Sequence, residues 1–152
     1  QPVCVPMDRS TLTAIVPDPA ADPFERLLGA MRRAYGPRYW ERHAASLAEA
    51  ARARLGFLPS VESRWAQAAA GASFSWSGRR ITAPALVMTG DQDRIVPPVN
   101  SQTLCRLIPG SRAEVFPGAG HYFFCEQPEA VNRALLGFLA VKSQEEAWLS
   151  PA

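Results

Sequence analysis

Two side chains in the second half of the chain have the types and the setting for acyl-transfer chemistry. Asp93 lies in a polar loop, residues 90–98, and His121 follows the small residues Gly118, Ala119 and Gly120. A histidine can take a proton from a nucleophile and return it to a leaving group. A carboxylate can hold the imidazole in one tautomer and stabilise the imidazolium. The small residues let the backbone turn sharply and bring the His121 ring into a site.

Each of these residues has a competitor or a plainer role. Asp91 is the rival acid, and its plainer role is that of a loop-capping or solvated carboxylate. His121 itself could be a hydrogen-bonded structural histidine. His43 lies in a predicted helix between Arg42 and alanines, which favours a surface or packing role over catalysis.

Both loops follow segments that are typical of strands. Residues 85–89 form a short apolar run behind Pro84, as expected of a strand that is buried on both faces of a parallel sheet. Residues 113–116 predict a second short strand, which ends at Pro117-Gly118. A helix over about 99–108 separates them, and a last helix starts near Pro128. This alternation predicts an α/β fold with parallel strands, whose reactive groups gather at the carboxyl ends of the strands.

Two strands alone do not make a stable parallel sheet, because each bare edge presents unpaired backbone donors and acceptors. We therefore expect this part to be the edge of a larger sheet whose other strands lie outside the sequence.

The first 80 residues have a different, helical rhythm. Asp22 and Pro23 predict the N-cap and first residue of a helix, and further helices are predicted over 39–55 and 60–70. These helices are rich in alanine and poor in large side chains. They are more typical of a cover packed on another element than of an independent core.

Residues 81–139 resemble the C-terminal segment of the α/β-hydrolase fold superfamily. The shared pattern includes Gly-x-x-Asp before an apolar pair and proline ("GDQDRIVP"), then "IPGS", "GAGH" and "PEAV". By position the resemblance makes Asp93 the triad acid and His121 the triad base, and the family order of nucleophile, acid and histidine fits. It implies that residues 1–80 are a helical lid and that residues 81–152 are the C-terminal part of the hydrolase core.

The resemblance fails at the nucleophile. Family members carry Gly-x-Ser-x-Gly on a strand-to-helix turn. No serine here has that context, and Ser73, Ser75 and Ser77 alternate through "GASFSWSGRR". Cys4 and Cys105 have no better setting. The N-terminal strands and the nucleophile elbow are thus expected in a preceding part or a partner chain, without which the chain should be inert.

The leading interpretation is a serine hydrolase that cleaves a small-molecule carboxylic ester through an acyl-enzyme, with no metal or cofactor. The alternatives are an acyltransferase, an epoxide or haloalkane hydrolase with an aspartate nucleophile, and a non-catalytic interaction subunit or pseudoenzyme of the same fold. Aromatic residues that could line an acyl pocket, or simply pack in the core, are Trp65, Phe74, Trp76 and the run Tyr122-Phe123-Phe124.

Composition and charge narrow the possible binding partners and the cellular location of the protein. A net charge of +2 with scattered arginines argues against nucleic acid, and no apolar run approaches the length that spans a membrane. Three widely spaced cysteines predict reduced, mostly buried thiols and a cytoplasmic protein. Lys142 is the only lysine among many arginines and alanines, which indicates a GC-rich, bacterial origin.

Overall fold

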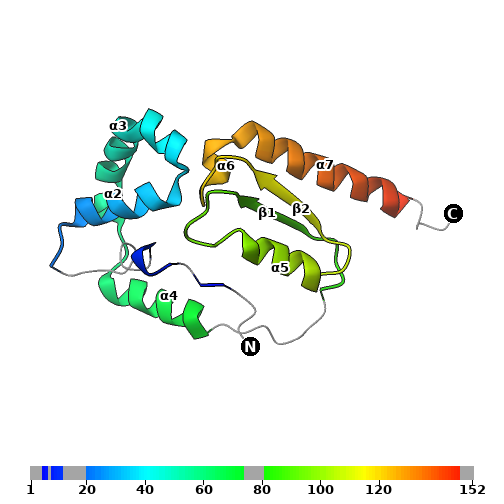
Figure 1. The fold of residues 1–152 in the computed structure, drawn as a ribbon, viewed down its shortest axis with the longest axis horizontal. Helices are drawn as coiled ribbons and strands as arrows, with labels where there is room; N and C mark the ends of the chain where they lie inside the picture. Colours follow the sequence, from blue (N-terminus) through cyan, green and yellow to red (C-terminus); the bar gives the residue numbers. More distant parts are fainter. Residues whose placement is uncertain (1–4, 7, 12–19, 74–80, 148–152) are drawn as a thin grey trace.

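A computed structural model describes residues 5–6, 8–11, 20–73 and 81–147, and its sheet is the element that sets the site (Figure 1). Strands β1 (Leu86–Gly90) and β2 (Arg112–Phe116) are parallel, with Leu86 opposite Arg112 and Gly90 opposite Phe116. Helix α5 (Val99–Leu107) connects them. The predicted α/β architecture is confirmed. Because both strands end in register, the loops that follow them leave the same edge of the sheet.

Helices cover both faces of this sheet (Figure 1). Helix α5 lies on one face, and α6 (Phe123–Glu126) with α7 (Pro128–Ala147) lies on the other. Phe116, Ala119 and Val131 form the buried cluster under α6 and α7, and the rings of Phe116 and Phe123 stack with centroids 5.0 Å apart.

Helix α6 corrects one prediction. The sequence predicted a last helix that starts near Pro128, but a single helical turn already begins at Phe123. The carbonyl oxygen of Tyr122 accepts hydrogen bonds from the backbone N–H groups of Cys125 and Glu126, which closes this turn. Phe123 packs inward, so Cys125, two residues on, faces away and is exposed, contrary to the expectation of mostly buried thiols.

The three predicted helices of the first half are confirmed, with shifted ends. They are α2 (Pro23–Ala34), α3 (Pro37–Arg54) and α4 (Val61–Ser73), with a 3₁₀ turn, η1 (Leu55–Phe57), after α3. The Asp22 carboxylate caps α2 by accepting from the Glu25 N–H at 2.9 Å. Helices α2 and α3 pack on each other and on Tyr122 from the second half, through a buried cluster of Met31, Tyr35, Leu47 and Ala51.

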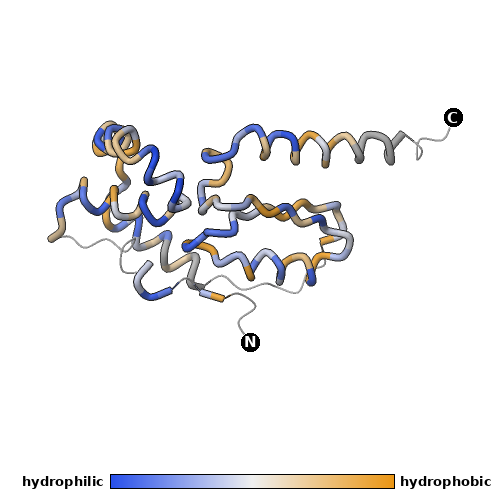
Figure 2. Tube along the Cα trace, turned by 45° about the horizontal axis from the view of Figure 1, so that its top comes forward, coloured by the Kyte–Doolittle hydropathy of each residue, from blue (hydrophilic) through white to orange (hydrophobic). Residues whose placement is uncertain are grey.

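The sheet is less buried than predicted. Leu86, Val87 and Met88 are only half-buried, because β2 is the one strand that pairs with β1 among the described residues. Both strands nonetheless carry apolar side chains, as the orange segments of Figure 2 show, although β2 also contains Arg112 and Glu114. Large apolar side chains are also exposed on β2 and α7: Val115, Leu136 and Leu139. Within the described ranges, no helix is long and apolar enough to cross a membrane.

The N-terminal lead-in is fastened to the start of α5. The buried Asn100 side chain accepts from the Val5 N–H at 2.6 Å and donates to the Val5 carbonyl at 2.8 Å. These two hydrogen bonds hold Val5 beside the helix that follows the Asp93 loop.

Candidate active site

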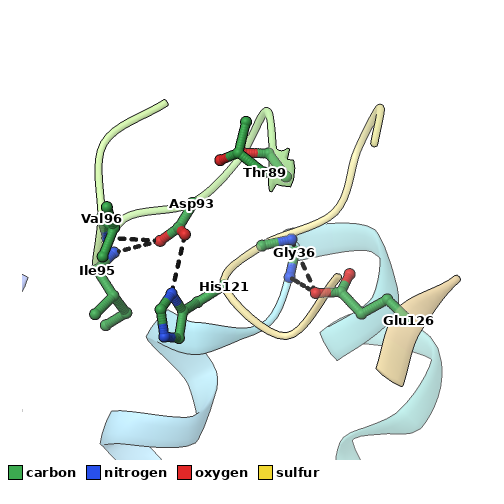
Figure 3. A network of polar contacts seen from close by, with 9 residues as sticks. Gly36, Thr89, Asp93, Ile95, Val96, His121 and Glu126 are labelled. Carbon is green, nitrogen blue, oxygen red and sulfur yellow. Dashed lines mark hydrogen bonds and ion pairs between the residues drawn. The ribbon is translucent and has the colours of Figure 1, made fainter. Parts of the chain in front are cut away.

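The Asp93 carboxylate is buried and held by its own loop. Its Oδ1 accepts hydrogen bonds from the backbone N–H groups of Ile95 and Val96, each at 2.8 Å (Figure 3). The side chain is only 4% exposed. These two backbone donors fix the orientation of the carboxylate, so Oδ2 is left to face the next loop.

That free oxygen meets His121. The Nδ1 atom of His121 lies 2.9 Å from Oδ2 of Asp93 (Figure 3). With an ionised carboxylate, Nδ1 carries the proton and donates it, which leaves Nε2 as the basic nitrogen. The ring is 37% exposed, and no hydrogen bond from the described residues occupies Nε2. The structure therefore brings together the two residues that the sequence singled out, with the second ring nitrogen open.

The two competitors lie elsewhere. Oδ1 of Asp91 accepts from the Gly118 N–H at 2.7 Å, so this carboxylate caps the turn after β2, as its plainer role predicted. Gly118 has a φ of 75°, the left-handed conformation that glycine tolerates. His43 is exposed on α3 with its ring 4.3 Å from that of Tyr39, which confirms a surface and packing role.

A junction of three glycines brings the loops together. A Cβ atom built on Gly90, at the end of β1, would lie 2.2 Å from the Ala119 carbonyl oxygen. One on Gly120 would lie 2.5 Å from the Ala34 carbonyl oxygen, and one on Gly36 would lie 2.2 Å from the Gly118 carbonyl oxygen. These approaches have no room for side chains. The His121 loop is thus pressed between the end of β1 and the turn that joins α2 to α3.

Glu126 was missed by the sequence reasoning. Its Oε1 accepts from both the Gly36 N–H, at 3.0 Å, and the Gly120 N–H, at 2.8 Å (Figure 3). One signal was available: Glu126 is the only charged residue between His121 and Pro128, and it follows the aromatic run Tyr122-Phe123-Phe124. Its partners, however, lie 90 and 6 residues away, and spacing alone does not reveal them.

The aromatic candidates divide between packing and exposure. Tyr122 packs edge-on against Tyr35 with centroids 5.1 Å apart, and Phe123 belongs to the core beside Phe116. Phe124 and Trp65 are about half exposed. A hollow beside the site is lined by Pro37, Arg38, Asp91, Gln92 and Gly118, and does not include Asp93 or His121.

No nucleophile accompanies the pair within the described residues. Ser73 is the last residue of α4 and Cys105 lies inside α5, so neither sits on a strand-to-helix turn. The described residues also hold no cluster of three or more histidine, cysteine or acidic side chains that could bind a metal ion. Cys4, Phe74, Ser75, Trp76 and Ser77 lie outside the described residues.

Comparison with known proteins identifies the fold family. The family model described as "alpha/beta hydrolase fold" matches residues 16–128, which is most of the chain. The chain belongs to this family. Both the Asp93 loop and the His121 loop fall inside the matched range, so the α/β-hydrolase resemblance and the fold class drawn from the sequence are confirmed.

Curated proteins that are similar to this chain include two with haloperoxidase-type names. A protein of Mycobacterium tuberculosis named non-heme bromoperoxidase BpoC is 42% identical over 62 residues, which cover 41% of this chain and 24% of BpoC. A non-heme haloperoxidase of Rhodococcus erythropolis is 40% identical over 62 residues, or 40% of this chain and 23% of that protein. The matched segment thus spans about a quarter of the curated relatives.

Solved α/β-hydrolase structures superpose over more of the chain. The BpoC structure matches with a TM-score of 0.69 at 24% identity, covering 90% of this chain and 54% of BpoC. Est816, described as an N-acyl homoserine lactone degrading enzyme, matches with a TM-score of 0.62 at 26% identity, covering 87% of this chain and 52% of Est816. The present chain corresponds to about half of each structure.

Proposed function

We propose that this chain is the lid and the C-terminal part of a serine hydrolase that cleaves a carboxylic ester. In this proposal Asp93 is the acid and His121 is the base of a catalytic triad. Residues 1–80 form the lid, and residues 81–152 form the end of the hydrolase core. No cofactor or metal takes part.

The observation that carries the proposal is the contact between His121 Nδ1 and Asp93 Oδ2 at 2.9 Å, with the carboxylate held by two backbone donors. A structural histidine pair needs neither an open second nitrogen nor a location at the carboxyl ends of parallel strands. Here both conditions are met. Nε2 would take the proton of a serine hydroxyl, and the imidazolium formed would be stabilised by the Asp93 charge.

The serine comes from a part outside this sequence, either preceding it or on a partner chain. The attack on the ester would form an acyl-enzyme, and His121 would protonate the leaving alcohol at Nε2. Water, activated by the same nitrogen, would then release the acid. Without the nucleophile and an oxyanion hole the pair has nothing to activate, so we expect the isolated chain to be inert.

The similarity to Est816 supports ester-type substrates, because a lactone is a cyclic ester. A second candidate, halide oxidation with peroxide, rests on the names of the two curated relatives. Parallel assays on the intact protein with short-chain p-nitrophenyl esters and with bromide plus hydrogen peroxide separate the two candidates.

The decisive experiment is fluorophosphonate labelling of the intact assembly. Wild-type protein should be labelled, and His121→Ala should reduce labelling strongly because the serine loses its base. His43→Ala is the matched control and should be labelled like the wild type, since that ring is exposed on α3. An unlabelled wild type would favour the non-catalytic subunit, and labelling that ignores His121 would refute the triad assignment.

A further inference from the structure

The carboxylate of Glu126 joins two segments that meet at His121. We propose that Glu126 is a positioning residue, which fixes the base by tying its loop to the turn between α2 and α3. The inference rests on the proposed function in taking His121 as the base. It assigns Glu126 no contact with substrate or with the reacting atoms.

The geometry concentrates both hydrogen bonds on one oxygen. Oε1 accepts from Gly120, the residue immediately before His121, at 2.8 Å and from Gly36 at 3.0 Å. Hydrogen bonds from backbone N–H groups to a carboxylate are shorter and stronger than those between neutral groups. Glu126 is itself half-buried, so water competes only partly for this oxygen.

His121 is held on its other side as well. The N–H of Tyr122, the residue immediately after it, donates to the Ala34 carbonyl at 3.1 Å. The backbone is therefore fastened directly before and directly after His121, in both cases to the α2–α3 turn or to the carboxylate that binds it. The Asp93 contact then fixes the remaining rotation of the ring.

The same contacts couple the helices to the base. Gly120 and Gly36 approach so closely that neither has space for a Cβ atom, and Tyr122 packs edge-on against Tyr35. A shift of the α2–α3 turn therefore moves the His121 loop with it. A misplacement of a catalytic group by about 1 Å can cost roughly 10²-fold in rate, so a small displacement is enough to matter.

The test compares Glu126→Ala and Glu126→Gln with Glu129→Ala, an exposed glutamate in the first turn of α7 that serves as control. In ¹⁵N-histidine-labelled intact protein, the ring nitrogens report the tautomer and order of His121, while His43 reports whether α3 is folded through its contact with Tyr39. We expect Glu126→Ala to replace the single tautomer of His121 by an exchanging mixture without moving His43. Glu126→Gln, whose amide oxygen can accept the same two bonds, should restore the wild-type signal.

Ester turnover by the intact protein should be lowered in the same variant that disturbs the His121 signal. Glu126→Ala should lower kcat about 10²-fold with little change in KM, and Glu129→Ala should match the wild type. An unchanged His121 signal in Glu126→Ala, or a Gln variant as perturbed as the Ala variant, would overturn the proposal. If the His121 signal responds as expected but the wild type is not labelled by fluorophosphonate, the hydrolase assignment fails while the positioning role stands.

Discussion

Asp91 and Asp93 lie two residues apart in one loop, yet their carboxylates have separate tasks. Asp91 accepts from the Gly118 N–H at 2.7 Å and so ties the loop after β1 to the turn after β2. Asp93 contacts His121 at 2.9 Å and is buried, whereas Asp91 is exposed. The Asp91 carboxylate therefore fixes the two loops relative to each other, and the Asp93 carboxylate orients the His121 ring.

The same substitution at these two positions should have unequal effects. In Asp93→Asn, the amide oxygen can still accept from Ile95 and Val96, so its NH₂ group would donate to His121 Nδ1 and force the proton onto Nε2. Ester hydrolysis by the intact enzyme should fall on the order of 10³–10⁴-fold. Asp91→Asn keeps an acceptor for Gly118 and should stay within a few-fold of the wild type. Equal losses would contradict the assignment of Asp93.

The glycine junction predicts a stability difference. In Gly90→Ala the new Cβ would lie 2.2 Å from the Ala119 carbonyl oxygen and 2.4 Å from that of Gly120, so backbone has to move. We expect a loss of about 3 kcal/mol in the free energy of unfolding, at the upper end for overpacking. Gly137→Ala, in α7 with nothing within 4 Å, should instead gain about 0.5–1 kcal/mol from helix propensity. Urea unfolding measures both, and a neutral Gly90→Ala would refute the close approach.

The Asn100 contact can be tested with a matched asparagine. Asn100→Ala removes two hydrogen bonds to Val5 and should cost about 1–2 kcal/mol, with faster hydrogen exchange at the Val5 amide. Asn132→Ala, on the exposed side of α7, should change neither quantity. If the exchange rate of the Val5 amide is the same in both variants, Asn100 does not hold the lead-in.

Alkaline pH should weaken the packing of α2 on α3. Burial raises the pKa of Tyr35 above its ordinary value of 10.0, and the neighbouring Cys125 and Tyr39 act in the same direction. The folded state then holds the phenol proton more tightly than the unfolded state, so the free energy of unfolding declines as the pH rises above about 10. Tyr35→Phe removes this part of the decline. Parallel stability curves for the two proteins between pH 9 and 12 would contradict the prediction.

The sequence predicted what local signals specify. Asp22-Pro23 predicted the start of α2, and the strand-like segments 85–89 and 113–116 predicted β1 and β2. Because parallel strands end at one edge, these elements also predicted that Asp93 and His121 would meet. The hydrogen bond between them confirms that expectation.

The contact between Gly36 and Glu126 could not be predicted from the sequence. Nothing in "AYGPR" shows that Gly36 receives the carboxylate of a residue 90 positions later, and a short helix such as α6 has too few residues for a periodic pattern. The apolar composition of β1 alone predicted burial on both faces, whereas burial depends on the neighbours of a strand. Among the described residues β2 is its one neighbour, and β1 is half-buried.

The contact of Gly36 with residues 118–126 also sets where this chain can be recombined. A chimera that exchanges the helices of the first half for those of a relative would have to carry a residue without a side chain at position 36. The side chain at position 126 would also have to accept a hydrogen bond from the N–H of residue 36. Residues 34–36 and 118–126 should therefore come from the same parent protein, although more than eighty residues of sequence separate them. An exchange bounded by two crossover points that both lie between residues 36 and 118, one of them at the exposed residues 59–60, leaves both segments with the same parent.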